Sequence, residues 1–170
     1  RRAGPLRHAH VADLPALLTP GDLIVVNDTR VFPARLLGRR VPSGGAVECL
    51  LVSRAVQEPA AAADPSSQTW EALMHPGQKL KPGARVVFDG AVTIHGEVVE
   101  RRFYGRRLVR LWTGDGSPLD EAVDRIGHVP LPPYIGRDDR PADRERYQTV
   151  FAVERGSVAA PTAGLHFSER

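Results

Sequence analysis

The sequence predicts an α+β protein in which an antiparallel β module is inserted into a mixed α/β domain. Three observations support this. Asp22–Asn27 is typical of a buried strand. Short strand-like runs separated by turn signals recur between about Ala34 and Leu111. Helical spacing then appears over Ser117–Gly127.

The first part of the chain combines a short helical segment with a strand. "HVADLPALLTPGD" favours an amphipathic turn or short helix that breaks at Pro20-Gly21. In "DLIVVN", Asp22–Asn27, four consecutive apolar residues lie between polar ones. We therefore expect a strand that is buried on both faces.

The middle of the chain has the sequence pattern of antiparallel β-strands. Its strand-like runs are "ARLLG", "AVECLLVS", "TWEALM", "ARVVF", "VTIHGEVV" and "RLVRLW". Several alternate in hydrophobicity, as half-buried strands do. Asp89-Gly90 is a candidate hairpin turn, and the low-complexity residues 57–68 favour a loop. A small β-barrel and a sandwich both fit this pattern.

A helix is predicted over Ser117–Gly127. Ser117 is the expected N-cap, Pro118 takes the first helical position and Gly127 ends the helix. The apolar stripe at helical spacing consists of Leu119, Ala122, Val123 and Ile126. After it, prolines force an extended path through "PLPPY", and a turn or short helix is expected in "ADRERYQTVF".

The composition excludes several classes of protein. The 170 residues are 42% hydrophobic and 25% charged, as in ordinary globular proteins. There is no apolar run long enough to cross a membrane. The single Cys49 lies in an apolar run and predicts a buried, inert thiol, which favours the cytoplasm. The histidines lack metal-ligand spacing, so no metal site is predicted.

The basic residues are almost all arginines. The formal net charge is +3, and only two of the 23 basic residues are lysines. Five arginines lie in "RRFYGRRLVR", residues 101–110, beside Phe103 and Tyr104. One interpretation is a contact with a nucleic-acid backbone. The other is a solvated hairpin.

Three polar stretches are candidates for chemistry, and the first is "NDTRVFPAR", residues 27–35. Asn27, Asp28 and Thr29 follow the predicted strand at its carboxyl end, where ligands gather in α/β folds. With Arg30 and Arg35 they favour an anion or ribose site. The alternative is an Asx-type turn with a local Asp–Arg pair.

The second stretch contains Tyr134 and Tyr147, which could stack on a base, and Gln148 and Thr149, which could hydrogen-bond a base edge. The alternative is that the tyrosines pack at a domain seam.

The third stretch is "AAPTAGLHF", residues 159–167. Its small residues would allow a ligand to approach the backbone. His166 is its one candidate acid or base near neutral pH, the alternative being a structural histidine.

Four long motifs carry a resemblance to a known family. "PGDLIVVNDTRVFPARLLGRR", "PLPPYI", "RYQTVFA" and "GSVAAPTAGLHF" occur in this order, with "LMHPGQKLKPGARVVF" between them. The chain resembles the S-adenosylmethionine:tRNA ribosyltransferase-isomerase family of queuosine biosynthesis. The resemblance implies transfer and isomerisation of the ribosyl part of S-adenosylmethionine onto 7-aminomethyl-7-deazaguanine at the tRNA wobble position. The products would be epoxyqueuosine-tRNA, adenine and methionine.

The resemblance also implies an architecture and partners. Residues 1–33 and 129–170 would belong to the α/β core domain, and residues 34–128 to an inserted antiparallel β-barrel domain. Since family chains extend beyond both ends of this one, we expect a fragment with an incomplete core domain that is inactive alone. S-adenosylmethionine would be the co-substrate, tRNA carrying the queuosine precursor the partner, with no metal, no membrane and a monomeric state.

The resemblance supports a set of site residues as a group. His166 and Asp28 are the catalytic candidates. The substrate-binding candidates are Asn27, Thr29, Arg30, Arg35, Tyr147, Gln148, Thr149, Thr162 and Gly164. The alternative function is a non-catalytic tRNA-binding β-barrel module.

Overall fold

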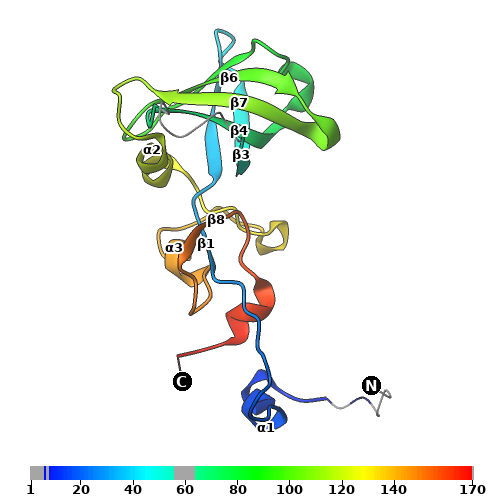
Figure 1. Ribbon diagram of the computed structural model, residues 1–170. Coiled ribbons are helices and arrows are strands. Elements are labelled where there is room, and N and C mark those ends of the chain that lie inside the picture. The colour runs from blue at the N-terminus through cyan, green and yellow to red at the C-terminus, as the bar shows by residue number, and fades with distance from the viewer. Residues whose placement is uncertain (1–5, 7, 56–63, 170) are drawn as a thin grey trace.

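The computed structural model describes residues 6, 8–55 and 64–169, so residues 57–63 of the predicted loop lie outside the described residues. A barrel occupies one end of the molecule, and a two-stranded sheet, β1–β8, lies in the middle (Figure 1). The short helix α1 (Leu14–Leu17) lies at the opposite end. The predicted α+β class is therefore confirmed.

The middle of the chain forms a closed antiparallel barrel with strand order β2-β3-β4-β7-β6-β5. This decides between the two expected architectures in favour of the barrel, and all six predicted strands are present. Their bounds are β2 (Arg35–Val41), β3 (Ala46–Arg54), β4 (Ser67–His75), β5 (Arg85–Phe88), β6 (Ile94–Arg101) and β7 (Arg106–Thr113). The predicted loop ends before Ser67, because Ser67 and Gln68 already belong to β4.

Inward-facing and outward-facing residues alternate along the strands, and the inward-facing side chains fill the barrel. On β7, Val109 and Leu111 are fully buried, whereas Arg110 between them and Arg106 at the start of the strand face outward. Cys49 is fully buried, as predicted, and burial raises the pKa of its thiol to about 12. The thiol therefore stays protonated and unreactive at neutral pH.

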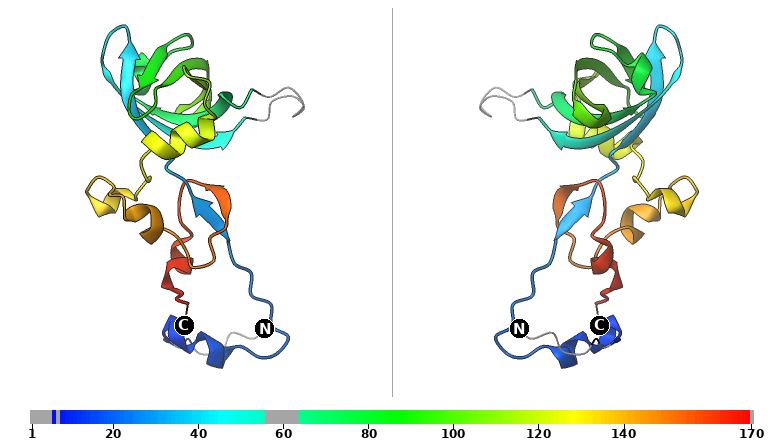
Figure 2. Two further views of the ribbon diagram at one scale, coloured as in Figure 1. Left: turned by 90° about the vertical axis from the view of Figure 1, so that its left-hand side faces the viewer. Right: turned by 90° about the vertical axis from the view of Figure 1, so that its right-hand side faces the viewer.

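Helix α2 (Leu119–Ile126) lies beneath the barrel, between it and the small sheet (Figure 2). Leu119, Ala122 and Val123 are buried, which confirms the predicted stripe. The predicted Ser117 cap is wrong: Pro118 is the N-cap. The hydroxyl of Ser117 instead donates to Asp115 Oδ1 at 2.7 Å.

The remaining elements are short. They are η1 (Val11–Asp13), η3 (Gly77–Lys79), η4 (Phe103–Gly105), η5 (Pro133–Ile135), α3 (Asp143–Arg146) and η6 (Thr162–His166). None of the helices in the described ranges is long and apolar enough to cross a membrane.

The small sheet pairs β1 (Thr29–Val31) with β8 (Glu154–Ser157) in parallel, although the whole barrel lies between them in the sequence. The chain enters and leaves the barrel side by side, since Arg35 and His128 exchange two backbone hydrogen bonds of 3.1 and 2.8 Å. Gly127 permits this close approach, because a Cβ there would lie 2.0 Å from the Pro33 carbonyl oxygen. The domain boundaries at residues 34 and 128 stay a prediction.

The predicted buried strand at Asp22–Asn27 is wrong. Residues 22–28 form no strand, and β1 begins only at Thr29. Leu23 and Val25 are 87% and 84% exposed. An apolar run shows that a segment favours burial, but the described part of the chain supplies no layer to cover this one.

We expect the Arg107→Met variant to lose about 2–4 kcal/mol of unfolding free energy. Arg107 is buried at the β6–β7 hairpin, and its guanidinium donates to four carbonyls, those of Gly77, Leu80, Gly105 and Arg106. Met fills the space but leaves these hydrogen bonds unmade. Urea unfolding measures the change. The control is Arg106→Met, which removes an exposed pair with Glu71 and should change little; equal losses in both variants would contradict this account.

Candidate functional site

The three polar stretches predicted from the sequence meet at the small sheet. β1 comes from the first stretch, and the second contacts it through Gln148. Just before the third, the Ser157 carbonyl at the end of β8 accepts from the Phe32 amide at 3.2 Å, and Ala160 of the third stretch packs against Val31. Segments more than 100 residues apart are thus assembled into one region.

The side-chain amide of Gln148 holds β1 in place. Its Oε1 accepts from the Val31 amide at 2.9 Å, and its Nε2 donates to the Val31 carbonyl at 2.8 Å. The same Nε2 donates to the Arg144 carbonyl at 3.0 Å. Gln148 therefore pairs with β1 as a neighbouring strand would, with both amide protons engaged. Its predicted contact with a base edge stays a prediction.

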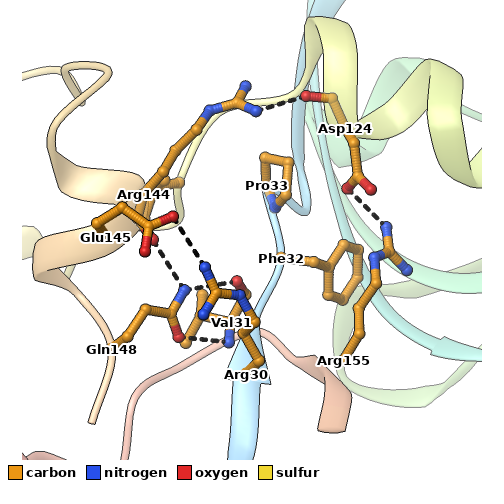
Figure 3. Close-up of a pocket in the computed structure, with 10 residues that line it drawn as sticks. Arg30, Val31, Phe32, Pro33, Asp124, Arg144, Glu145, Gln148 and Arg155 are labelled. Carbon is orange, nitrogen blue, oxygen red and sulfur yellow. Dashed lines mark hydrogen bonds and ion pairs between the residues drawn. The ribbon is translucent and has the colours of Figure 1, made fainter. Parts of the chain in front are cut away.

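Two arginines stand opposite one another across the small sheet. Arg30 and Arg155 are partners in the parallel register, and both line a cavity of about 270 Å³ (Figure 3). Like charges placed opposite each other destabilise a sheet unless they are neutralised. Here Arg30 pairs with Glu145 at 2.8 Å, and Arg155 pairs with Asp124 at 2.9 Å.

The two guanidinium groups differ in their surroundings. Arg155 lies 4.4 Å from the centre of the Phe32 ring, and Phe32 stands between the two arginines in Figure 3. The Arg30–Glu145 pair is open to solvent, with side chains 39% and 76% exposed. Such exposed pairs contribute little stability.

Arg144 joins the same region to the barrel helix. Its guanidinium donates to the Asp124 carbonyl at 2.5 Å (Figure 3) and to the Gly127 carbonyl at 2.9 Å. These carbonyls lie at the C-terminal end of α2, where a cation complements the helix dipole. Arg144 thus fixes α3 against α2.

A second cavity of about 590 Å³ lies beside the proline-rich segment. This volume is within the range of small-molecule sites. Arg35 lines it and forms a two-pronged pair with Glu48 at 2.8 and 3.2 Å, which holds the pKa of Glu48 below its ordinary value. Tyr147, whose pKa is raised by partial burial, lines it together with Val158.

Two aspartates order the wall of this larger cavity. Asp139 lies 2.7 Å from His128 Nδ1 and accepts from the Val129 amide at 2.9 Å. Asp143 accepts both prongs of the Arg137 guanidinium, at 2.7 and 2.9 Å, which holds the pKa of Asp143 well below its ordinary value. The segment between α2 and α3 is therefore fixed by charged hydrogen bonds.

Of the first predicted stretch, Asn27, Asp28 and Thr29 line neither cavity. Asn27 Oδ1 accepts from the amide and the hydroxyl of Thr29 at 3.0 and 2.6 Å, which is the Asx-type turn expected as an alternative. Asp28 is exposed, and its backbone carbonyl accepts from the amides of Val153 and Glu154. Its carboxylate therefore stands at the start of β1.

The last predicted residues form a separate group. Gly164 is packed so tightly that a Cβ would lie 2.6 Å from the methyl of Thr149. The Thr149 hydroxyl is buried and has no hydrogen-bond partner among the described residues. Thr162 and His166 are exposed, and neither lines the two cavities. The structure thus joins Thr149 to Gly164 but leaves His166 on the surface.

Several residues that line the two cavities were not predicted from the sequence: Asp124, Arg137, Asp139, Arg144, Glu145 and Arg155. Arg155 lies 31 residues from Asp124, and no periodic pattern links the two. Within the described ranges, no group of three or more His, Cys, Asp or Glu residues is arranged to hold a metal ion.

Comparisons with known proteins agree on one family. The profile of the family described as "Queuosine biosynthesis protein" matches residues 1–170. The S-adenosylmethionine:tRNA ribosyltransferase-isomerase of Solibacter usitatus is 52% identical, over 92% of this chain and 46% of that protein. The protein of the same name from Sorangium cellulosum is 44% identical, over 99% of this chain and 47% of that protein.

A solved structure is also similar. The crystal structure of S-adenosylmethionine tRNA ribosyltransferase from Thermotoga maritima shares 25% identity at a TM-score of 0.40, over 85% of this chain and 42% of that one. The chain spans about half the length of the curated relatives it matches. Because the family profile matches throughout the chain, the chain belongs to the queuosine biosynthesis protein family.

Proposed function

We propose that the protein transfers and isomerises the ribosyl moiety of S-adenosylmethionine onto 7-aminomethyl-7-deazaguanine at the tRNA wobble position. Epoxyqueuosine-tRNA, adenine and methionine are the products. One observation carries the proposal: three motif stretches converge on β1–β8 in a chain that is 52% identical to a relative named for this reaction. The activity belongs to the whole protein, of which residues 1–33 and 129–170 supply core-domain segments and residues 34–128 the inserted barrel.

The larger cavity is the proposed place for a purine, either adenine or the modified guanine. Tyr147 offers an aromatic ring beside walls formed by Pro130 and Pro132. Arg35 lies on the same cavity and carries a guanidinium suited to a carboxylate or phosphate. Arg30, on the smaller cavity, is the second proposed anion ligand.

The proposed chemistry needs a base beside the sulfonium and an acid for the departing purine. The base removes a proton from the ribose C5′, and the acid assists adenine. The His166 imidazole can serve in either role near neutral pH. The exposed Asp28 carboxylate binds ribose hydroxyls or orients the attacking amine. S-adenosylmethionine is the co-substrate, and no proposed step uses a metal.

An adenine-release assay tests this function. Full-length protein is incubated with S-adenosylmethionine and tRNA that carries the precursor base, and free adenine is measured by chromatography. Release that depends on the precursor base supports the proposal. Binding of the tRNA without release would instead favour the alternative of a non-catalytic tRNA-binding barrel, for which the arginine-rich β6–β7 hairpin is the favouring observation.

We expect His166→Ala to reduce turnover about 100-fold or more while tRNA affinity changes less than about twofold, because general acid–base groups act on the transition state. Single-turnover adenine release and filter binding give the two values. His8→Ala, which alters another exposed histidine, is the control. Parallel losses of turnover and affinity would remove His166 from the catalytic role.

We expect Gln148→Glu to lower the unfolding free energy by about 2–3 kcal/mol. A carboxylate keeps the acceptor for the Val31 amide but loses the donors to the Val31 and Arg144 carbonyls. If Gln148 positions β1, the melting temperature and the rate of adenine release should fall together. Glu145→Gln, three residues earlier in an exposed pair, is the matched control and should leave stability nearly unchanged. Unchanged stability of Gln148→Glu with a raised KM for tRNA would instead indicate base recognition.

A further inference from the structure

The tip of the β6–β7 hairpin presents two aromatic rings to solvent. Phe103 and Tyr104 in η4 are 88% and 96% exposed. Tyr104 has φ 55°, in the left-handed region that a bulky residue rarely adopts. Neither ring is buried against the barrel, so packing of the fold does not explain why aromatic residues occur at this tip.

The tip is nevertheless fixed. The buried guanidinium of Arg107 donates to the carbonyls of Gly105 and Arg106 at 2.9 Å each, and to those of Leu80 and Gly77 at 3.0 and 2.8 Å. The Arg102 amide donates to the Arg106 carbonyl at 2.9 Å. The backbone that carries the two rings is therefore fixed before any partner arrives, which lowers the entropic cost of binding.

Positive charge surrounds the rings. Residues 101–110 carry five arginines, and the carboxylates that face them are Glu71, Glu97 and Glu100. Arg102 pairs with Glu100 and Arg106 with Glu71, each at 3.0 Å, and Arg110 lies 3.9 Å from Glu97. These pairs are exposed and weak, so phosphate groups can compete for the arginines.

The same face continues toward a second aromatic group. Arg110 lies 5.3 Å from the centre of the Trp112 ring, and Trp112 stacks on His95. Between Trp112 and the tip, a groove of about 550 Å³ is lined by Arg102, Leu108 and Arg110. Glu97 also lines this groove, and the rings of Phe103, Tyr104 and Trp112 lie outside its lining. A basic surface that carries exposed aromatic rings is the pattern of proteins that bind single-stranded nucleic acids.

We propose that the outer face of the β6–β7 hairpin binds an unpaired segment of RNA. Phe103 and Tyr104 stack on bases, while Arg102, Arg106 and Arg110 contact phosphates. Stacking requires exposed base faces, which a duplex hides, so the occupant is a loop or single strand. The choice of RNA as partner rests on the proposed function; the position of the surface rests on the structure.

The test measures RNA affinity in the absence of S-adenosylmethionine. Full-length protein is titrated into a fluorescein-labelled oligouridylate of about 12 nucleotides, within the site sizes of barrel proteins, and anisotropy is recorded. The variant is Phe103→Ala with Tyr104→Gly. Glycine accepts the left-handed conformation, so a loss of affinity cannot arise from added backbone strain at residue 104.

We expect the double variant to bind at least about tenfold more weakly, at an unchanged melting temperature, and Tyr104→Phe to bind normally. Arg102→Gln should lower the slope of log affinity against log salt by about 0.7. Arg39→Gln, which removes another exposed arginine, paired with Asp89, is the charge-matched control and should leave affinity unchanged.

Affinity of the double variant within twofold of the unaltered protein would overturn the proposal and leave the hairpin as a surface for a protein partner. So would equal losses in Arg102→Gln and Arg39→Gln. A duplex of the same length that binds as tightly as the single strand would also overturn it. Because adenine release is not measured here, failure of the proposed reaction and failure of this surface are separate results.

Discussion

The parallel pairing of β1 with β8 is the constraint on which the rest of the molecule depends. Parallel strands need a crossover between them, and here the crossover contains an entire closed barrel. The barrel returns its two ends to one place, where Arg35 and His128 exchange backbone hydrogen bonds. The connection from β1 to β8 is long in sequence, but its two ends lie side by side. Segments on either side of the barrel can therefore contribute to one site.

The same pairing creates an electrostatic problem that shapes the site. It places Arg30 opposite Arg155, and each arginine is paired with a carboxylate, from α3 and from α2 respectively, which reduces their repulsion. In the larger cavity Arg35 is likewise held by Glu48. The guanidinium groups are thus oriented before a ligand binds, and an anion needs only to displace an exposed carboxylate, as at Glu145, rather than to order a free side chain.

The barrel was predictable from sequence because each strand carries its own alternation of inward and outward residues. The exposed conformation of Asp22–Asn27 was not predictable, since an apolar run shows that burial is favoured without showing which element would cover the segment. The motifs correspond to segments that the structure brings together at β1 and Gln148, but residue type alone suggested base contact for a side chain that is engaged with backbone. Arg155 was missed because its partners lie on a distant helix. The predicted roles of His166 and Asp28 stay predictions.

The junction between the barrel and the small sheet combines apolar and polar contacts. Val31, Val129 and Ala160 form an apolar cluster separate from the barrel core. Phe32 belongs to the barrel core, and Val158, which follows β8, packs against that core. The backbones of Arg35 and His128 are hydrogen-bonded at the same place. Around these contacts lie the Arg144 hydrogen bonds to the end of α2 and the Arg155 pairs with Asp120 and Asp124. The small sheet is therefore joined to the barrel both through the barrel's apolar core and through charged contacts with α2, so the register of β1 with β8 and the placement of the barrel depend on the same residues.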